Sequence, residues 1–282
     1  MTQAVTPELR QWILAQSQSG FAAEQIRVAM LGVGWDDALA SQALNLVLLD
    51  HNLTEQHEAT LPPAVAVPQP ALTDAPWYID TSDRRVHVLS RIAQPPIVVF
   101  GDVLSQEECD ALIAAAQPRM ARSLTVSVKN GGEEVHEDRT SRGMFFRRNE
   151  NEVVARVERR LAELVNWPIE NGEGLQILHY RPGAEYKPHY DYFDPAEPGT
   201  ASILKRGGQR VATIIMYLSA SEKGGGTVFP DVHCEVAPQR GNAVFFSYDR
   251  AHPSSKSLHG GTPVIAGEKW IATKWLRERR FE

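Results

Sequence analysis

The sequence contains little cysteine, no long hydrophobic run and no excess of positive charge. Two cysteines in 282 residues form one disulfide at most, which excludes a disulfide-stapled secreted scaffold. No stretch approaches the roughly eighteen apolar residues of a membrane helix, and the N-terminus lacks the basic and then apolar pattern of a signal peptide. A net charge of −6 argues against broad attraction to nucleic acid or to an anionic membrane. We therefore expect a cytoplasmic protein that binds neither nucleic acid nor membrane.

Three short helical patterns occupy residues 1–56. Thr6 followed by proline predicts the N-cap of the first helix, a second pattern runs from Ala23 to Leu31, and a third begins after a cap at Asp36. Such helices bury one small core, for which the candidates are Trp12, Ile26, Met30 and Trp35. In size and in its glycine-containing turn the segment resembles ubiquitin-associated-like modules. We expect a module that binds a protein partner, with a helical appendage of no binding function as the alternative.

An Ala/Pro-rich stretch follows this module. Residues 57–77 have no periodicity and predict an extended, semi-rigid linker, so a domain boundary is expected there. Beyond it, helical patterns cover 105–116 and 152–165. Short β-rich runs separated by Gly, Pro and Asn turns predict strands over 97–100, 125–128, 144–146, 175–180, 210–218, 243–246 and 270–276. Early helices followed by many antiparallel strands predict a mainly β domain over 78–282, a double-stranded β-helix or jelly roll with flanking helices.

Two His-x-Asp pairs occur in this region, and on a strand such a pair projects from one face. His136 and Asp138 follow two glycines in a charged stretch, where we expect a solvated loop. His189 and Asp191 lie in an aromatic-rich segment, where a concave site is more plausible. The second pair is therefore the better candidate for binding a metal ion.

The third ligand should be a histidine from a later strand, with His233, His252 and His259 as candidates. The first two lie in polar turns, where histidines are usually solvated. Lys269 follows His259 at the start of a β-rich run, and a lysine that points into a barrel needs an anion such as a metal-bound dicarboxylate. We therefore favour His259. Two histidines and one carboxylate suit Fe(II) with a 2-oxo acid and O₂, although these residues alone do not exclude zinc.

Several runs beyond these residues resemble one known family. LHYRPGAEYKPHYDYF, GQRVATIIMYLS, GGGTVFP and SLHGGTPVIAGEKWIATKW occur in this order, and PPIVVFGDVLSQEECDALI and RTSRGMFF precede them. They are similar to the prolyl 4-hydroxylase branch of the Fe(II)/2-oxoglutarate-dependent dioxygenases over about residues 78–282. By motif position the resemblance implies that His189, Asp191 and His259 bind iron. It also implies that Lys269 pairs with the C5 carboxylate of 2-oxoglutarate.

The same resemblance assigns further residues. It implies that Tyr180 binds the co-substrate carboxylate, with a core aromatic as the alternative. It places three residues along the substrate cleft, where plain core packing is the alternative: Tyr186, Arg210 and Trp275.

Two positions depart from the family pattern. Arg142 stands where the family more often has a small residue, and Gly226 stands where an acid is common. Neither is an expected iron ligand, but either change would alter which peptide fits.

The resemblance implies an enzyme that hydroxylates peptidyl proline to 4-hydroxyproline and releases succinate and CO₂. Its cofactors would be Fe(II), 2-oxoglutarate and O₂, with ascorbate as a further candidate, and its partner a proline-containing peptide or protein. The glycine-bearing loops around 131–132 and over 194–208 are suited to be lids. Two alternatives stay open. One is a 2-oxoglutarate oxygenase acting on a free amino acid, a lysyl peptide or an alkylated base, and the other is a non-catalytic jelly-roll interaction protein.

Overall fold

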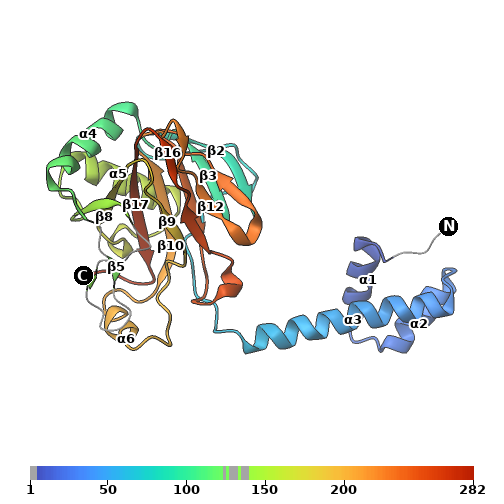
Figure 1. Cartoon of the computed structure of the whole chain (residues 1–282). Coiled ribbons are helices and arrows are strands. Elements are labelled where there is room, and N and C mark those ends of the chain that lie inside the picture. Colours follow the sequence, from blue (N-terminus) through green and yellow to red (C-terminus); the bar gives the residue numbers. More distant parts are fainter. Residues whose placement is uncertain (1–4, 123–124, 127–132, 135–139) are drawn as a thin grey trace. The chain divides into compact units, whose positions relative to one another are not determined.

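The computed structural model describes residues 5–122, 125–126, 133–134 and 140–282. The chain divides into two compact units, Met1–Pro62 and Pro63–Glu282 (Figure 1). Each unit has a hydrophobic core of its own. Within the described residues, no helix has the length and apolar character needed to cross a membrane.

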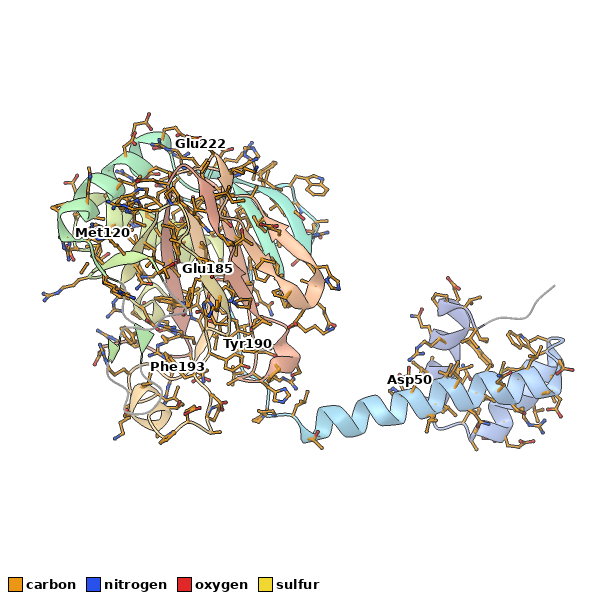
Figure 2. The ribbon with its side chains drawn as sticks, viewed as in Figure 1. Asp50, Met120, Glu185, Tyr190, Phe193 and Glu222 are labelled. Atoms are coloured by element: carbon orange, nitrogen blue, oxygen red, sulfur yellow. The ribbon has the colours of Figure 1, made fainter. Side chains whose placement is uncertain are left out.

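The first unit contains three helices, as predicted: α1 (Pro7–Gln18), α2 (Ala23–Gly32) and α3 (Asp37–Thr60). Thr6 caps α1 by accepting a hydrogen bond from the Leu9 amide. An ion pair between Arg10 of α1 and Asp50 of α3 adds a polar link, and Figure 2 shows Asp50 on its helix. The fully buried side chains are apolar residues from all three helices: Ile13, Ile26, Met30, Ala40, Ala43, Leu44 and Val47.

Trp12 does not belong to this core, contrary to the prediction. Its side chain is 37% exposed, whereas its neighbour Ile13 is fully buried. Leu9 and Ile13 lie one helical turn apart and share the inward face of α1, which directs Trp12 toward solvent. Trp35 is partly buried against the core.

The segment predicted as a linker is not free over its whole length. Helix α3 continues to Thr60, and the following chain lies on the second unit. The Val65 amide donates to the Asp249 carbonyl at 2.8 Å, and the Gln69 amide donates to the Val165 carbonyl at 3.0 Å. Backbone hydrogen bonds therefore fix the extended Pro-rich stretch onto the β unit. The division between the two units, after Pro62, falls within the predicted segment 57–77, and the part from Val65 onward belongs to the second unit.

The second unit is built from two facing sheets. The major sheet has nine strands in the spatial order β1 (Tyr78–Asp80), β2 (Arg85–Ile92), β3 (Ile97–Gly101), β14 (Ala243–Ser247), β10 (Arg210–Tyr217), β17 (Lys269–Arg277), β8 (Leu175–Tyr180), β7 (Arg142–Phe146) and β4 (Ala121–Arg122). The minor sheet has four, in the order β13 (Cys234–Val236), β12 (Thr227–Phe229), β15 (His259–Gly261) and β9 (Tyr186–His189). Two short pairs complete the described strands: β11 (Lys223–Gly224) with β16 (Val264–Ala266), and β5 (Thr125–Val126) with β6 (Glu133–Glu134).

Pairings within these sheets are antiparallel. The predicted jelly roll with flanking helices is therefore confirmed. Six of the predicted strands match β3, β7, β8, β10, β14 and β17. The run predicted over 125–128 is described only as β5, because 127–128 lie outside the described residues.

Helices α4 (Gln106–Ala116) and α5 (Glu152–Leu164) cover the outer face of the major sheet (Figure 1). Ser105 and Glu108 form the predicted capping box of α4, and Asn151 caps α5. Strand alternation on β10 explains the two cores. Its even-numbered apolar residues face the helices, whereas Ile215 and Tyr217 face the space between the sheets.

Short turns connect these elements. They are a helical turn, α6 (Thr200–Ile203), and 3-10 turns at Gln117–Arg119, Ile169–Asn171, Pro230–Val232 and Pro253–Ser255. Two strand registers then position the site. His259 of β15 pairs with His189 of β9, and Lys269 of β17 pairs with Tyr180 of β8.

Candidate functional site

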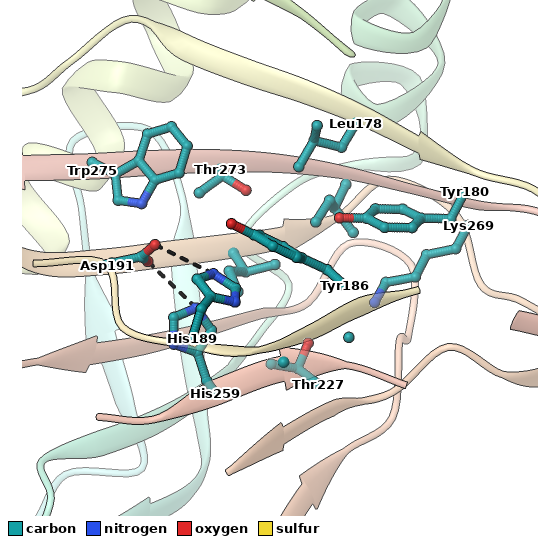
Figure 3. A pocket seen from close by; sticks show the side chains of 14 residues that line it. Leu178, Tyr180, Tyr186, His189, Asp191, Thr227, His259, Lys269, Thr273 and Trp275 are labelled. Carbon is teal, nitrogen blue, oxygen red and sulfur yellow. Dashed lines mark ion pairs between the residues drawn. The ribbon is translucent and has the colours of Figure 1, made fainter. Parts of the chain in front are cut away.

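A pocket lies between the two sheets of the second unit (Figure 3). Its lining combines possible metal ligands, one lysine, hydroxyl-bearing side chains and an apolar wall: Leu178, Tyr180, Tyr186, His189, Asp191, Ile215, Thr227, His259, Gly260, Gly261, Lys269, Ile271, Thr273 and Trp275. Figure 3 shows the histidines and Asp191 at one end of the pocket, and Tyr180 and Lys269 at the other.

The first end brings together the three predicted metal ligands. His189 ends β9, Asp191 follows it by two residues, and His259 begins β15. His189 Nε2 lies 3.6 Å from Asp191 Oδ1, and His259 Nε2 lies 3.4 Å from Asp191 Oδ2. Adjacent ligands of an octahedral ion with bonds of about 2.1 Å are about 3 Å apart. One ligand atom from each of the three residues lies within 4.8 Å of the other two, so the triad would have to contract to hold a divalent ion.

The histidine tautomers suit this role. Nδ1 of His189 lies 2.8 Å from the Lys187 carbonyl, and Nδ1 of His259 lies 3.0 Å from the Ser257 carbonyl. A carbonyl oxygen only accepts, so each Nδ1 carries the proton and each Nε2 offers a lone pair to a metal. Burial lowers the pKa of His259 to about 4, which favours the neutral ring that a ligand must be.

Asp191 supplies the negative charge of the site. Burial alone would raise its pKa, but the two histidines and Arg210 outweigh that effect and hold the pKa below its ordinary value. The carboxylate is therefore ionised. Thr213 Oγ1 also donates to Asp191 Oδ2 at 2.7 Å, which fixes the orientation of the carboxylate.

Lys269 lies at the other end, with 3% of its surface exposed. Its Nζ is 5.4 Å from the ring centre of Tyr180 and 5.9 Å from that of Tyr217. No described residue forms an ion pair with it, and burial lowers its pKa to about 8. A buried ammonium without an anion favours a ligand that brings a carboxylate. A dicarboxylate that reaches from the metal end to Lys269 meets this requirement.

The chain is similar to known proteins over this region. Residues 175–277 match the model of the 2OG-Fe(II) oxygenase superfamily. Prolyl 4-hydroxylase 5 of Arabidopsis thaliana is 41% identical over 221 residues, which cover 71% of this chain and 74% of that protein. Prolyl 4-hydroxylase 1 of the same plant is 43% identical over 202 residues, which cover 66% and 70%. This chain belongs to the prolyl 4-hydroxylase family of Fe(II)/2-oxoglutarate dioxygenases.

A solved structure is similar as well. It is that of a viral collagen prolyl hydroxylase from Paramecium bursaria Chlorella virus-1, in a 2-oxoglutarate complex. The identity is 31% and the TM-score 0.50, over 64% of this chain and 95% of that one. This prolyl 4-hydroxylase family member is thus a 2-oxoglutarate-dependent dioxygenase, with Fe(II), 2-oxoglutarate and O₂ as its cofactor set. The neutral imidazoles, the carboxylate and the unpaired lysine described above fit that set.

Two of the three residues expected along the substrate cleft line the pocket. Tyr186 stacks on the His189 ring with 3.7 Å between the ring centres. Trp275 lies beside Asp191 (Figure 3), is 7% exposed, and has no hydrogen-bond partner for its buried Nε1 among the described residues. Their contact with a substrate stays a prediction.

Arg210 is not among the residues that line this pocket, and its contact with a substrate stays a prediction. It lies behind Trp275, 3.9 Å from the centre of that ring, and donates to both carboxylate oxygens of buried Glu173 at 2.7 and 3.0 Å. A buried guanidinium needs such a carboxylate, and Glu173 supplies it from another segment. Arg210 also donates to the backbone carbonyl of Asp191 at 3.4 Å, so it supports a metal ligand.

The two departures from the family pattern have clear surroundings. Arg142 is exposed and donates to the Met120 carbonyl at 2.6 Å. A Cβ at Gly226 would lie 2.3 Å from Glu235 Oε1, so no side chain fits there unless Glu235 moves. Glu235 on the neighbouring strand therefore provides an acid in the space where the family more often has one at 226.

Three functional side chains were missed by the sequence reasoning. Thr227 lines the pocket, and its Oγ1 accepts from Tyr217 at 2.8 Å. Thr213 and Tyr248 lie behind Asp191. A signal existed for Thr213, because alternation along β10 directs Thr213, Ile215 and Tyr217 to one face. No local signal could identify Tyr248.

The remaining expectations concern loops. His136, Asp138 and the glycines at 131–132 lie outside the described residues. The segment 194–208 contains α6, with Thr200 buried and its Oγ1 donating to the Asp194 carbonyl at 2.7 Å. It is packed in the structure, and its role as a lid stays a prediction.

Proposed function

We propose that this protein hydroxylates prolyl residues of peptides to 4-hydroxyproline, while 2-oxoglutarate and O₂ are converted to succinate and CO₂. One observation carries the proposal. The pocket holds a triad of His189, Asp191 and His259 at one end and, at the other, a buried Lys269 that forms no ion pair with a described residue. The prolyl substrate is supported by the names of the relatives that share the fold.

The chain's own residues have separate tasks in this reaction. Fe(II), 2-oxoglutarate and O₂ together supply the oxidising power to replace an aliphatic C–H bond by C–OH. The triad binds the metal from one side of the pocket, and Lys269 with Tyr180 binds the far carboxylate of the co-substrate. Leu178, Ile215 and Ile271 form an apolar wall that excludes water.

The pocket favours a peptide over a free amino acid. Lys269 is the one lysine or arginine among the residues described as lining the pocket, and the co-substrate occupies it. The carboxylate of a free amino acid would then have no positive partner in the pocket. A prolyl residue inside a peptide has no free carboxylate and needs no such partner. The Trp275 N–H is suited to donate to a peptide carbonyl. Phe145 extends the apolar face for a prolyl ring, because it is exposed and lies 6.4 Å from Trp275 between ring centres.

A substrate comparison tests the proposal. The purified protein would be incubated with Fe(II), 2-oxoglutarate and, in parallel, a proline-rich peptide, free proline or a lysine-rich peptide. We expect one added oxygen on proline of the peptide, with succinate formed in equal amount. The matched control is Asp191→Ala, which should abolish turnover because a metal ligand is lost. Oxygen added only to lysine or to free proline would contradict the substrate assignment, and full turnover by the variant would contradict the triad.

We also propose a cellular location, a further cofactor and a protein partner for the enzyme. A cytoplasmic location is supported by the two cysteines, Cys109 and Cys234, which are both free. Ascorbate is proposed as a further cofactor, and added ascorbate should then prolong turnover. For the first unit we propose a protein partner, which pull-down with residues 1–62 against a blank resin would test.

A further inference from the structure

A pair of buried hydroxyls lies directly behind the metal end of the pocket. Thr213 is in the middle of β10 and fully buried, and Tyr248 follows β14 with 2% of its surface exposed. Thr213 Oγ1 is 2.7 Å from Asp191 Oδ2 and 3.0 Å from the Tyr248 hydroxyl. Three separate segments thus meet in one hydrogen-bonded chain.

The donor and acceptor in each of these hydrogen bonds follow from the number of hydrogens that the hydroxyl groups carry. An ionised carboxylate only accepts, so the single hydroxyl hydrogen of Thr213 points to Asp191 Oδ2. The Thr213 oxygen must then accept from Tyr248. Burial raises the pKa of Tyr248 well above its ordinary value, so the phenol keeps the hydrogen that it donates. Tyr248 therefore donates to Thr213, and Thr213 donates to Asp191.

The backbone holds both hydroxyls in register. The Tyr248 amide donates to the Val211 carbonyl at 3.0 Å, on the same strand that carries Thr213. The Tyr248 ring also packs edge-on against Tyr192, with 6.3 Å between the ring centres. Neither hydroxyl can turn away without leaving a buried polar group unpaired, which is costly.

The hydrogen bond distinguishes the two oxygens of Asp191. Each oxygen faces one histidine: Oδ1 lies 3.6 Å from His189 Nε2, and Oδ2 lies 3.4 Å from His259 Nε2. Only Oδ2 also accepts a hydrogen bond from Thr213, whereas Oδ1 accepts from no described residue. Two histidines and one carboxylate oxygen leave three positions of an octahedral ion open for 2-oxoglutarate and O₂. If both oxygens of Asp191 bound the metal, one of those positions would be lost.

We propose that Thr213 and Tyr248 are positioning residues that keep Asp191 a one-oxygen ligand, bound through Oδ1. The inference rests on the metal site of the proposed function and is independent of the substrate. Its chemistry is specific, since a donor held on Oδ2 withdraws that oxygen from the metal. Tyr248 strengthens the donor by polarising the Thr213 hydroxyl.

Crystals soaked with Mn(II) test this directly. Thr213→Val keeps the shape of the side chain and removes the donor, so both oxygens of Asp191 should bind Mn(II), whereas the unchanged protein should bind through Oδ1 alone. Thr213→Ser retains the hydroxyl and should restore one-oxygen binding. Binding through both oxygens in the unchanged protein, or through one in Thr213→Val, would overturn the proposal.

Kinetics of 2-oxoglutarate decarboxylation give a second readout. We expect Thr213→Val to lower kcat by about tenfold or more, the effect of a lost hydrogen bond to a charged group. KM for 2-oxoglutarate should change little, because Lys269 is untouched. Tyr248→Phe should lower kcat in the same direction and by less. An unchanged kcat in both variants would contradict the proposal.

Thr81→Val is the matched control. Thr81 is half-buried and donates a hydrogen bond at 2.8 Å, but to the Arg84 backbone and outside the pocket lining. It should lose stability without a change in kcat or in Mn(II) geometry. The experiments distinguish a failure of the proposed function from a failure of the positioning role of Thr213 and Tyr248. If no peptide is hydroxylated while Mn(II) changes its binding in Thr213→Val, the proposed function fails and this inference stands.

Discussion

The burial of Lys269 predicts how the affinity for 2-oxoglutarate depends on pH. Its pKa is lowered to about 8 by burial, and a carboxylate ligand binds the charged form. Protonation is therefore complete well below pH 8 and is lost as the pH rises through that value. The affinity for 2-oxoglutarate should be constant up to about pH 7 and weaken above pH 8, by up to tenfold per pH unit. Anaerobic titration of the Fe(II)-loaded protein, followed by its visible charge-transfer band, measures this affinity.

Lys269→Arg provides the control for that titration. A guanidinium stays charged across this range, so the variant should show no weakening near pH 8, whatever its absolute affinity. A decline at the same pH in both proteins would assign the titration to another group. Above pH 8 the free energy of unfolding of the ligand-free protein should rise, whereas the affinity for 2-oxoglutarate falls. The unfolded chain binds more protons than the folded one above pH 8, so stability should rise from pH 8 to pH 10.

At the scale of elements, a buried ion pair joins α5 to β17. Lys274 donates to Glu158 and to the Glu173 carbonyl, and Lys274 and Glu158 are almost wholly buried. Lys274→Met should destabilise the fold by about 3–5 kcal/mol, because it leaves the Glu158 charge buried without a cation. Urea unfolding measures this loss. Adding Glu158→Leu should recover part of it, and a loss below 1 kcal/mol in the single variant would contradict this account.

Local sequence patterns predict the strands and part of the site, but they do not predict contacts between distant segments. The strands and the His189, Asp191, His259 and Lys269 positions were predictable, because alternation and motif spacing are local properties of the chain. The pairing of Arg210 with Glu173 was not predictable, because the two residues are 37 positions apart and meet only in the folded protein. Tyr248 was missed for the same reason, since its contact with Thr213 spans 35 residues.

At the scale of the whole molecule, the two units have separate cores. A chain of residues 63–282 should therefore fold and turn over 2-oxoglutarate at the rate of the full protein. A chain that begins at residue 78 should have a lower Tm, because it loses the hydrogen bonds of Val65 and Gln69 to the β unit. Thermal unfolding and succinate formation check both. Equal Tm values for the two shortened chains would show that the Pro-rich stretch does not stabilise the β unit.

We propose that the triad and Lys269 serve a dioxygenase that acts on peptidyl proline. The most direct measurement follows both oxygen atoms in one reaction, run under isotopically labelled O₂ with a proline-rich peptide. Mass spectrometry should find one labelled atom on a proline of the peptide and the other in succinate, with neither product formed by Asp191→Ala. Labelled succinate with an unmodified peptide, or label on a residue other than proline, would contradict the claim.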